Sequence, residues 1–342
     1  MRLLNASWIF LKLKIDLRNP ETQFALEVVR AGSSLARRVC SETSIRSLTK
    51  SDNSPVTLAD LGIQAVAGAL LEQYFPQGML VAEESTDVLK SFEGPADLEK
   101  LENYVKAFFP QATSQAICDW IDRGKAVPGP SFWTLDPIDG TRGFLRGGQY
   151  VTALALIREG KLEMAALGCP NLKTPEALGR HLGLLVLAVR GKGCWGTALE
   201  GGDRWIPFKV SHCKDITQAR ILESMEPGHR DVEKGKCIRK IMGIIPEPLP
   251  LDSQAKHVVL AMGKAEVFYR TLSQKHPERR EKIWDVAPGA LAIEEAGGRV
   301  TDLDGKAIDY GCGVTLSNSP GFVATNGLLH EAVLKTLSEV AG

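Results

Sequence analysis

The sequence lacks any excess of charge, any long apolar run and any abundance of aromatic residues. Its 41 lysine and arginine residues are balanced by 41 aspartate and glutamate residues, and aromatic residues make up only 6%. A chain without net charge has no global electrostatic field to attract a polyanion or a membrane surface. No segment approaches the roughly eighteen consecutive apolar residues of a membrane span. We therefore expect neither nucleic acid nor a membrane as a partner, so any anion site must be built locally.

The sequence also lacks paired cysteines and clustered histidines. The seven cysteines show no short spacing, and the six histidines form no HxH or HxxxH pattern. This argues against a zinc site. An odd number of scattered cysteines indicates reduced thiols, so we expect a reducing compartment. The cytosol, the nucleus, a plastid and a mitochondrion all satisfy this condition, and the sequence leaves the choice open.

What the chain does have is enough apolar material for a large core. Hydrophobic residues make up 44% of its 342 residues, which is long enough for two domains. Residues 1–17 are a leader of unknown role, for which an extra strand, a disordered leader and a transit segment fit about equally well. Residues 18–206 predict an N-terminal α+β domain. Residues 207–342 predict a C-terminal α/β domain, because strand and helix patterns alternate there.

Hydrophobic spacing predicts the individual elements. Apolar residues recurring every three or four positions predict helices over residues 21–40, 57–75, 96–107, 232–242, 253–261, 285–296 and 328–340. Short apolar runs predict strands over residues 79–82, 132–135, 150–157, 161–168, 182–189, 193–195, 220–223, 248–251, 266–269 and 321–324. Short turns separate the strands between residues 150 and 195, as in a largely antiparallel sheet.

Residues 135–147, LDPIDGTRGFLRG, carry the clearest chemical signal. Asp136 ends an apolar strand, and the fixed backbone of the following proline brings Asp139 round to the same side. Both carboxylates could then reach one cation. Gly140 permits a tight turn, and Thr141 could open a helix whose free N–H groups face an anion. The same acids could instead merely cap backbone donors, so this segment alone does not decide the function.

Further acids lie at the ends of other apolar elements. Asp60 opens an expected helix, Glu83 and Glu84 follow an expected strand, and Asp285 precedes a small, apolar helix. Open α/β folds collect their chemistry at the ends of such elements. Carboxylate oxygens suit hard cations such as magnesium better than zinc. The sequence therefore predicts a magnesium site that could bind a phosphate group.

Four motifs together resemble a known phosphatase family. They are EES at 83–85, DPIDGT at 136–141, WD at 284–285 and EAGG at 295–298. In combination they are similar to the magnesium-dependent, lithium-sensitive phosphatases related to inositol monophosphatase, and the resemblance covers roughly residues 21–340. It implies a two-domain α+β and α/β fold, stacked as an αβαβα layered sandwich with the site between the domains.

Finer motifs are most similar to the 3'(2'),5'-bisphosphate nucleotidases within that family. These motifs are GFLRG at 143–147, CPNL at 169–172, DSQAK at 252–256 and EKIWD at 281–285. The resemblance implies two or three magnesium ions, held by the Ile138 carbonyl and by the side chains of Glu83, Asp136, Asp139 and Asp285. It also implies that Asp60 and Thr141 orient and deprotonate the attacking water.

The same resemblance implies where the substrate binds. Lys256 and Arg270 would hold the phosphate that is not cleaved, and Ser253 would assist them. Thr141 and Asp285 would contact the substrate as well as serving the catalytic centre. Many relatives carry a histidine where this chain has Val232. The contact with the base would then fall to His229 or be absent.

The expected activity is hydrolysis of the 3'-phosphate of adenosine 3',5'-bisphosphate to AMP and phosphate. The resemblance also implies activity on 3'-phosphoadenosine 5'-phosphosulfate, inhibition by lithium and a monomeric enzyme. Two alternatives remain. An inositol polyphosphate 1-phosphatase could use the same family motifs, although the DSQAK segment weighs against it. A non-catalytic nucleotide sensor could use the same fold, although a complete set of water-activating residues would then serve no purpose.

Overall fold

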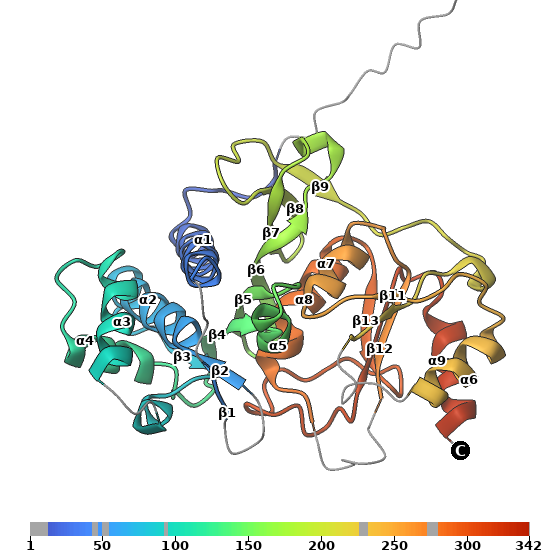
Figure 1. Ribbon diagram of the computed structural model, residues 1–342. Coiled ribbons are helices and arrows are strands. Elements are labelled where there is room, and N and C mark those ends of the chain that lie inside the picture. The colour runs from blue at the N-terminus through green and yellow to red at the C-terminus, as the bar shows by residue number, and fades with distance from the viewer. Residues whose placement is uncertain are drawn as a thin grey trace, which may run out of the picture.

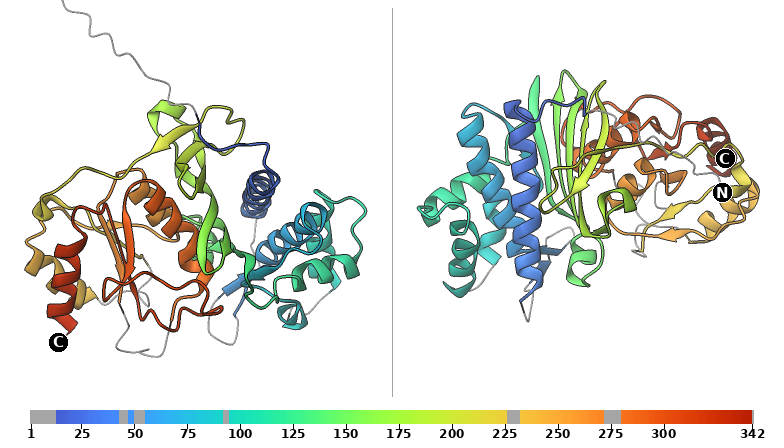
Figure 2. Two further views of the ribbon diagram at one scale, coloured as in Figure 1. Left: turned by 180° about the vertical axis from the view of Figure 1, so that it is seen from behind. Right: turned by 90° about the horizontal axis from the view of Figure 1, so that it is seen from above.

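The computed structural model describes residues 13–42, 47–49, 55–91, 95–225, 232–271 and 280–341. Its helices and sheets form five layers in the order helix, sheet, helix, sheet, helix, which Figure 1 shows from one side. Figure 2 shows the same layers from behind and from above. This arrangement confirms the predicted αβαβα sandwich.

Two long helices, α1 (Pro20–Cys40) and α2 (Leu58–Tyr74), form the main part of the first layer. Asn19 caps α1, because its side chain accepts hydrogen bonds from the backbone N–H groups of Glu21 and Thr22. Thr57 caps α2 in the same way, and its backbone N–H donates in turn to the Asp60 carboxylate. Asp60 thus lies in the first helical turn, as predicted.

The large sheet has seven strands in chain order, from β3 at one edge to β9 at the other. β3 and β4 are parallel, and every later neighbouring pair is antiparallel. The strands are β3 (Leu80–Ala82), β4 (Ser131–Asp139), β5 (Val151–Arg158), β6 (Lys161–Lys173), β7 (Leu182–Val189), β8 (Gly193–Ala198) and β9 (Ile206–Phe208). This confirms the predicted antiparallel run.

Alternate side chains of this sheet enter two different hydrophobic cores. In β7, Leu185 and Leu187 face the core shared with α1 and α2, whereas Leu184 and Val186 face the opposite core. Consecutive side chains of a strand point to opposite faces of the sheet, and nearly all of them are apolar here. Both faces are therefore apolar, and helices cover each of them. The β5–β6 hairpin closes through Glu159 and Gly160, which both have positive φ angles, 47° and 69°.

The middle layer contains α7 (Ala255–Ala261) and α8 (Ile283–Glu295), which pack against each other. The second sheet has the order β12–β14–β13 and is antiparallel. Its strands are β12 (Val267–Arg270), β13 (Arg299–Asp302) and β14 (Phe322–Thr325). The last layer, α6 (Val232–Met242) and α9 (His330–Ala341), buries Ile238, Val333 and Leu337 against this sheet.

Several smaller elements complete the described part of the chain. Two further helices, α3 (Pro95–Lys106) and α4 (Ser114–Asp122), lie on the outer side of α2, and α5 (Thr141–Leu145) is a single turn. The short strands are β1 (Ser47–Thr49), β2 (Pro55–Thr57), β10 (Leu222–Glu223) and β11 (Leu249–Pro250). The 3-10 turns are η1 (Thr86–Ser91), η2 (Glu176–Leu178) and η3 (Ile216–Gln218).

The sequence patterns did not predict α4, the β1–β2 hairpin, β9 or β13. Of the nine residues of α4 only Ile117 and Ile121 are buried, so it offers a single periodic pair. Among the helices in the described ranges, none combines the length and apolarity needed to cross a membrane. The predicted leader, residues 1–17, lies mostly outside the described residues, and the predicted domain boundary near residue 206 stays a prediction.

Candidate active site

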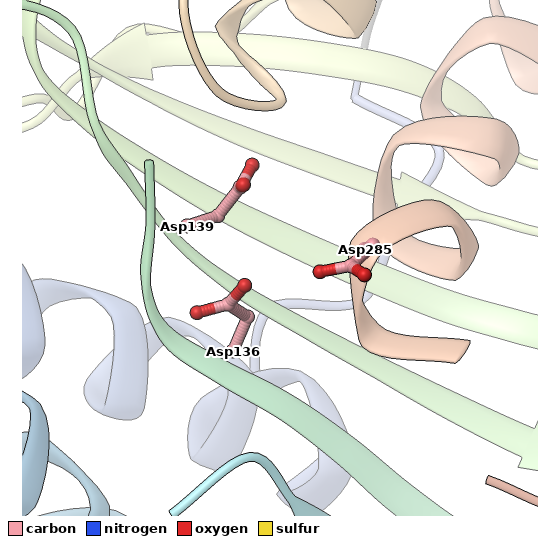
Figure 3. A group of neighbouring side chains, drawn as sticks. All are labelled: Asp136, Asp139 and Asp285. Atoms are coloured by element: carbon pink, nitrogen blue, oxygen red, sulfur yellow. The ribbon is translucent and has the colours of Figure 1, made fainter. Parts of the chain in front are cut away.

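Three carboxylates from two distant parts of the chain meet at the end of the large sheet. Asp136 and Asp139 lie within the last four residues of strand β4, and Asp285 lies in the first turn of α8. One oxygen from each side chain lies within 4.8 Å of the others. Figure 3 shows the three side chains projecting into the same space between β4 and α8. The structure therefore brings together three of the five predicted metal-ligating positions.

The backbone of β4 explains why two acids three residues apart reach one space. The pairing of β4 with β5 changes register between Asp136 and Asp139, at Pro137. Pro137 has no backbone N–H to continue the ladder, and its carbonyl accepts a hydrogen bond from the Thr152 hydroxyl at 3.0 Å. Gly140 then turns the chain with a φ of 86°. A Cβ atom there would lie 2.8 Å from the Ser253 Cβ, so only glycine fits.

Asp285 is held by the start of its own helix. It occupies the third position of α8, and its Oδ2 accepts a hydrogen bond from the Lys282 backbone N–H at 3.1 Å. This bond fixes the side chain while leaving the other oxygen available to a ligand. Burial and the charge of Glu281, followed by those of Glu83 and Asp139, raise the pKa of Asp285 well above its ordinary value.

The other two carboxyl groups are also perturbed by burial first and by neighbouring charges second. Burial and the charge of Glu83 raise the pKa of Asp136 well above its ordinary value, and Asp139, Asp285 and Asp60 add to this. Burial raises the pKa of Asp139 to about 6, although the charges of Lys256 and Arg270 and a backbone hydrogen bond from Gln254 oppose the shift. Together the carboxylates repel one another and favour a cation between them.

Glu83 and Asp60 lie close enough to act electrostatically on Asp136. Glu83 follows β3, and its backbone N–H donates to the Leu135 carbonyl of β4 at 3.3 Å. Asp60 is fully buried, and its Oδ2 accepts hydrogen bonds from the backbone N–H and the hydroxyl of Thr57 at 2.8 and 2.6 Å. The roles predicted for these two acids stay predictions.

A buried glutamine links the elements that carry Asp60 and Glu83. Gln64 of α2 donates to the carbonyls of Glu84 and Ile121 at 2.6 and 2.7 Å and accepts from the Glu84 backbone N–H at 2.9 Å. The first turn of α2 and the segment after β3 are thereby fixed to each other. Gln64 carries no recognisable signal in the sequence, because all its partners are backbone atoms.

Thr141 and the Ile138 carbonyl contact each other directly. The Thr141 hydroxyl donates to this carbonyl at 3.1 Å, and the Ile138 side chain is buried in the core beneath. A carbonyl oxygen has two lone pairs, so the bond leaves room for a second partner. α5, which begins at Thr141, packs against β2, the strand that leads into Asp60. The predicted proton transfer between Thr141 and Asp60 stays a prediction.

A pair of basic side chains lies beside the carboxylates. Lys256 is buried, its Nζ donates to the Leu251 carbonyl at 3.1 Å, and burial together with the charge of Arg270 lowers its pKa to about 8. Arg270, at the end of β12, forms an ion pair with Glu281 at 3.6 Å. Both basic groups act on the pKa of Asp139, so the positive and negative groups form one continuous site.

Ser253, a predicted substrate contact, lies in the same site. Ser253 is buried and has a positive φ of 63°, a conformation that costs a non-glycine residue about 1–2 kcal/mol. Its hydroxyl donates to the Asp252 carbonyl at 2.6 Å and accepts from the Ala255 backbone N–H at 3.2 Å. His229, the predicted contact for the base, lies outside the described residues.

The donor set fits a divalent cation with a preference for oxygen. The three clustered side chains offer only carboxylate oxygens, and no cysteine or histidine joins the cluster within the described ranges. The Asp136 Oδ1 is buried and has no hydrogen-bond partner among the described residues. A buried acceptor without a partner is costly, and a bound cation would satisfy it.

Comparison with known sequences assigns the chain to a family. The sequence model described as Inositol monophosphatase family matches residues 18–341. A 3'(2'),5'-bisphosphate nucleotidase of Schizosaccharomyces pombe is 36% identical over 344 residues, which cover 94% of this chain and 95% of that protein. The 3',5'-bisphosphate nucleotidase 2 of Arabidopsis thaliana is 37% identical over 309 residues, 85% of this chain and 87% of its own length.

Solved structures agree on the fold. The Thermotoga maritima IMPase superposes with a TM-score of 0.63 at 20% identity, covering 94% of this chain and 98% of its own. CysQ from Bacteroides thetaiotaomicron, a bacterial member of the inositol monophosphatase family, gives a TM-score of 0.60 at 19% identity, covering 91% and 99%. At these identities the similarity establishes the architecture alone.

Proposed function

The chain belongs to the inositol monophosphatase family, and we propose that it is a metal-dependent phosphomonoesterase that removes the 3'-phosphate of adenosine 3',5'-bisphosphate, giving AMP and phosphate. Enzymes of this family are generally metal-dependent and act on small molecules. The observation that carries the proposal is the cluster of buried Asp136 with half-buried Asp139 and Asp285, which lies beside two basic side chains. The names of the nucleotidase relatives support the nucleotide as substrate.

We propose that the cation is Mg²⁺ and that two or three ions bind. Asp136, Asp139 and Asp285 would hold them, and Glu83 and the Ile138 carbonyl would complete the set. When bound, such cations supply an activated water and stabilise negative charge on the phosphoryl and leaving oxygens. The side chains contribute a rigid arrangement of oxygens, because the bulge in β4 and the first turn of α8 fix their positions.

Asp60 is the proposed proton acceptor for the attacking water. The two hydrogen bonds that it accepts from Thr57 hold its carboxylate in one orientation. Thr141 would orient the water, because its hydroxyl can accept one hydrogen bond while donating another.

Lys256 and Arg270 are the proposed contacts for the phosphate that stays on the product. Their charges lie within electrostatic reach of Asp139, so an anion bound to them would lie next to the reacting phosphate. Arginine and lysine bind phosphate oxygens through charge-assisted hydrogen bonds. Ser253 would add a hydroxyl, and His229 would contact the base.

Phosphate release by the purified full chain, titrated with Mg²⁺, tests this function. Adenosine 3',5'-bisphosphate, 3'-phosphoadenosine 5'-phosphosulfate, inositol 1,4-bisphosphate and inositol 1-phosphate would be compared, with Asp139→Asn as the blank. We expect preference for the bisphosphate nucleotide and inhibition by millimolar lithium but not by potassium. Preference for inositol 1,4-bisphosphate would instead identify an inositol polyphosphate 1-phosphatase, and nucleotide binding without turnover would identify a sensor.

We further propose a monomer that works in a reducing compartment. All seven cysteines are free thiols, and two of them, Cys169 and Cys194, are buried. Burial raises the pKa of both thiols, which keeps them protonated and unreactive. Sizing of the purified chain in reducing buffer, with and without Mg²⁺, tests the monomer.

A further inference from the structure

Gln254 connects two of the clustered carboxylates through hydrogen bonds made by both its backbone and its side chain. It precedes the first turn of α7, and its side chain is 1% exposed. Its backbone N–H donates a hydrogen bond to Asp139 Oδ2. Its side-chain amide reaches into the first half of α8, the helix that carries Asp285.

The side-chain amide of Gln254 bonds α8 at the point where that helix is weakened. Pro288 lies inside α8 and has no backbone N–H. In a regular helix the Trp284 carbonyl would accept from the N–H of residue 288, so this proline leaves the carbonyl without that donor. Gln254 Nε2 donates to the Trp284 carbonyl at 2.9 Å and replaces the missing bond.

The other half of the same amide satisfies a neighbouring donor. The Gly289 backbone N–H donates to Gln254 Oε1 at 2.9 Å. One partner is an acceptor and the other is a donor, so a single amide orientation satisfies both, and no other side chain of this length offers both groups. Trp284 immediately precedes Asp285, so the bonds from Gln254 hold the turn that presents this carboxylate.

The segment before α7 is itself fixed against β4. Ser253 adopts its positive φ directly beside Gly140, where the two backbones approach so closely that a Cβ on Gly140 would lie 2.8 Å from the Ser253 Cβ. The peptide between Ser253 and Gln254 therefore has little freedom, and its N–H points at Asp139. Any movement of Gln254 relative to α8 would move Asp139 relative to Asp285.

We propose that Gln254 is a positioning residue that sets the separation of Asp139 and Asp285 and thereby the cation affinity of the site. The inference rests on the proposed function only in assuming that these acids bind a divalent cation. It does not depend on which phosphate ester is the substrate. Gln254 itself touches neither the cation nor the reacting atoms. It acts through the hydrogen bonds that it makes to Asp139, Trp284 and Gly289.

The test measures Mn²⁺ binding to the metal-free full chain, using the electron paramagnetic resonance signal of free Mn²⁺. Gln254→Met removes both side-chain hydrogen bonds at similar volume. Gln254→Asn keeps the amide but shortens it by one methylene, so it cannot reach both the Trp284 carbonyl and the Gly289 N–H from the same backbone position. Loss of a partner that orients metal ligands typically weakens binding by about 10- to 100-fold, and we expect this for both variants.

Gln254→Asn separates positioning from the loss of a polar group. The variant keeps an amide and adds no charge, so weaker Mn²⁺ binding would come from displaced ligands. Unchanged or tighter binding by this variant would overturn the proposal, and the result counts even if Gln254→Met does not fold.

A second pair of variants tests the link to the helix interruption. Pro288→Ala restores the backbone N–H that α8 lacks, so it should supply the Trp284 carbonyl with a donor. Gln254→Met combined with Pro288→Ala should bind Mn²⁺ at least fivefold more tightly than Gln254→Met alone, whereas Pro288→Ala alone should stay within twofold of wild type. Additive effects of the two substitutions would contradict the proposed geometry.

Thr301→Val provides the control for a purely structural effect. Its hydroxyl bonds His330 at 2.9 Å in a buried network that contacts none of the three carboxylates. It should lower the melting temperature in EDTA without changing Mn²⁺ affinity, and equal behaviour of Gln254→Met would overturn the positioning role. Wild-type protein that binds Mn²⁺ but releases no phosphate from adenosine 3',5'-bisphosphate would refute the proposed function alone. The affinity comparison would still decide the role of Gln254.

Discussion

Replacing Asp139 by asparagine is expected to stabilise the cation-free protein. Burial raises the pKa of this carboxyl group from 3.8 to about 6. Stability from the protonated form is therefore complete below pH 3.8 and is lost as the pH rises through 6. At pH 7 the ionised group destabilises the folded state by about 3 kcal/mol, since 2.2 pH units correspond to about 1.36 kcal/mol each. Asparagine keeps an acceptor for the Gln254 N–H and carries no charge. We therefore expect Asp139→Asn to raise the free energy of unfolding by the same amount.

The gain should be visible as a shift in melting temperature. An unfolding entropy of about 2.1 cal/mol/K per residue gives about 0.7 kcal/mol/K for 342 residues. A gain of about 3 kcal/mol then corresponds to about 4 °C. At pH 4.5 wild-type Asp139 is itself largely protonated, so the difference should shrink to about 1 kcal/mol.

Calorimetric unfolding of both proteins in EDTA at pH 7 and pH 4.5, and again at pH 7 with Mg²⁺, measures the effect. With Mg²⁺ the order should reverse, because only the wild-type site binds the cation and is stabilised by it. Asp302→Asn is the matched control, because Asp302 accepts backbone N–H bonds from Asp304 and Lys306 at 2.9 and 2.8 Å and should lose stability when neutralised. An Asp139→Asn protein that is no more stable than wild type in EDTA at pH 7 would refute the reasoning.

Three further substitutions test other parts of the structure. Burial lowers the pKa of His257 from 6.5 to about 3. The folded state therefore loses stability as the pH falls below 6.5, because the unfolded chain takes up a proton there and the folded chain does not. The free energy of unfolding of His257→Phe, measured with urea relative to that of wild type, should rise by about 2 kcal/mol between pH 7 and pH 5. A difference that stays constant over this range would contradict the reasoning. Lys256→Met should lower kcat/KM at least 100-fold for adenosine 3',5'-bisphosphate but less than tenfold for 3'-AMP, and equal losses would exclude a contact with the second phosphate. Gln64→Leu should cost about 3 kcal/mol in urea unfolding, because it removes the side-chain partner of the Glu84 N–H and carbonyl, whereas the Ile121 carbonyl keeps the Gly124 N–H. A loss under about 1 kcal/mol would show that the Glu84 groups find other partners.

The sequence predicted the elements that bury a full periodic face. α1 and α2 repeat apolar residues over several turns, so their period identified them. β5 to β7 are short apolar runs separated by turns, because their side chains enter two cores. α4 and β13 were missed because each offers too little pattern. In β13, Val300 is the only apolar residue of four, and the strand forms because β14 supplies its partner groups. Such short elements depend on tertiary pairing and not on local preference.

The carboxylates were predicted as candidate ligands of shared cations, but Asp285 was placed with the other two only by the family resemblance. Asp136 and Asp139 share one motif, and the residue types of Pro137 and Gly140 predict the turn between them and after them. Asp285 lies far along the chain, and nothing in its local sequence states which strand end it will face. The family resemblance supplied that link, and the stacking of α8 on the large sheet shows its physical origin.

The roles of Gln254 and Gln64 could not be predicted from the sequence, for a common physical reason. Their partners are mostly backbone N–H and carbonyl groups, which every residue carries, so no complementary residue type marks the contact. Pro288 is the one local indication in the sequence, because a proline inside a helix leaves the carbonyl four residues earlier without its usual donor. A buried amide that satisfies such a carbonyl joins two elements at a fixed distance. In this chain both amides lie next to the segments that present the carboxylates, so the geometry of the site depends on residues with no chemical role of their own.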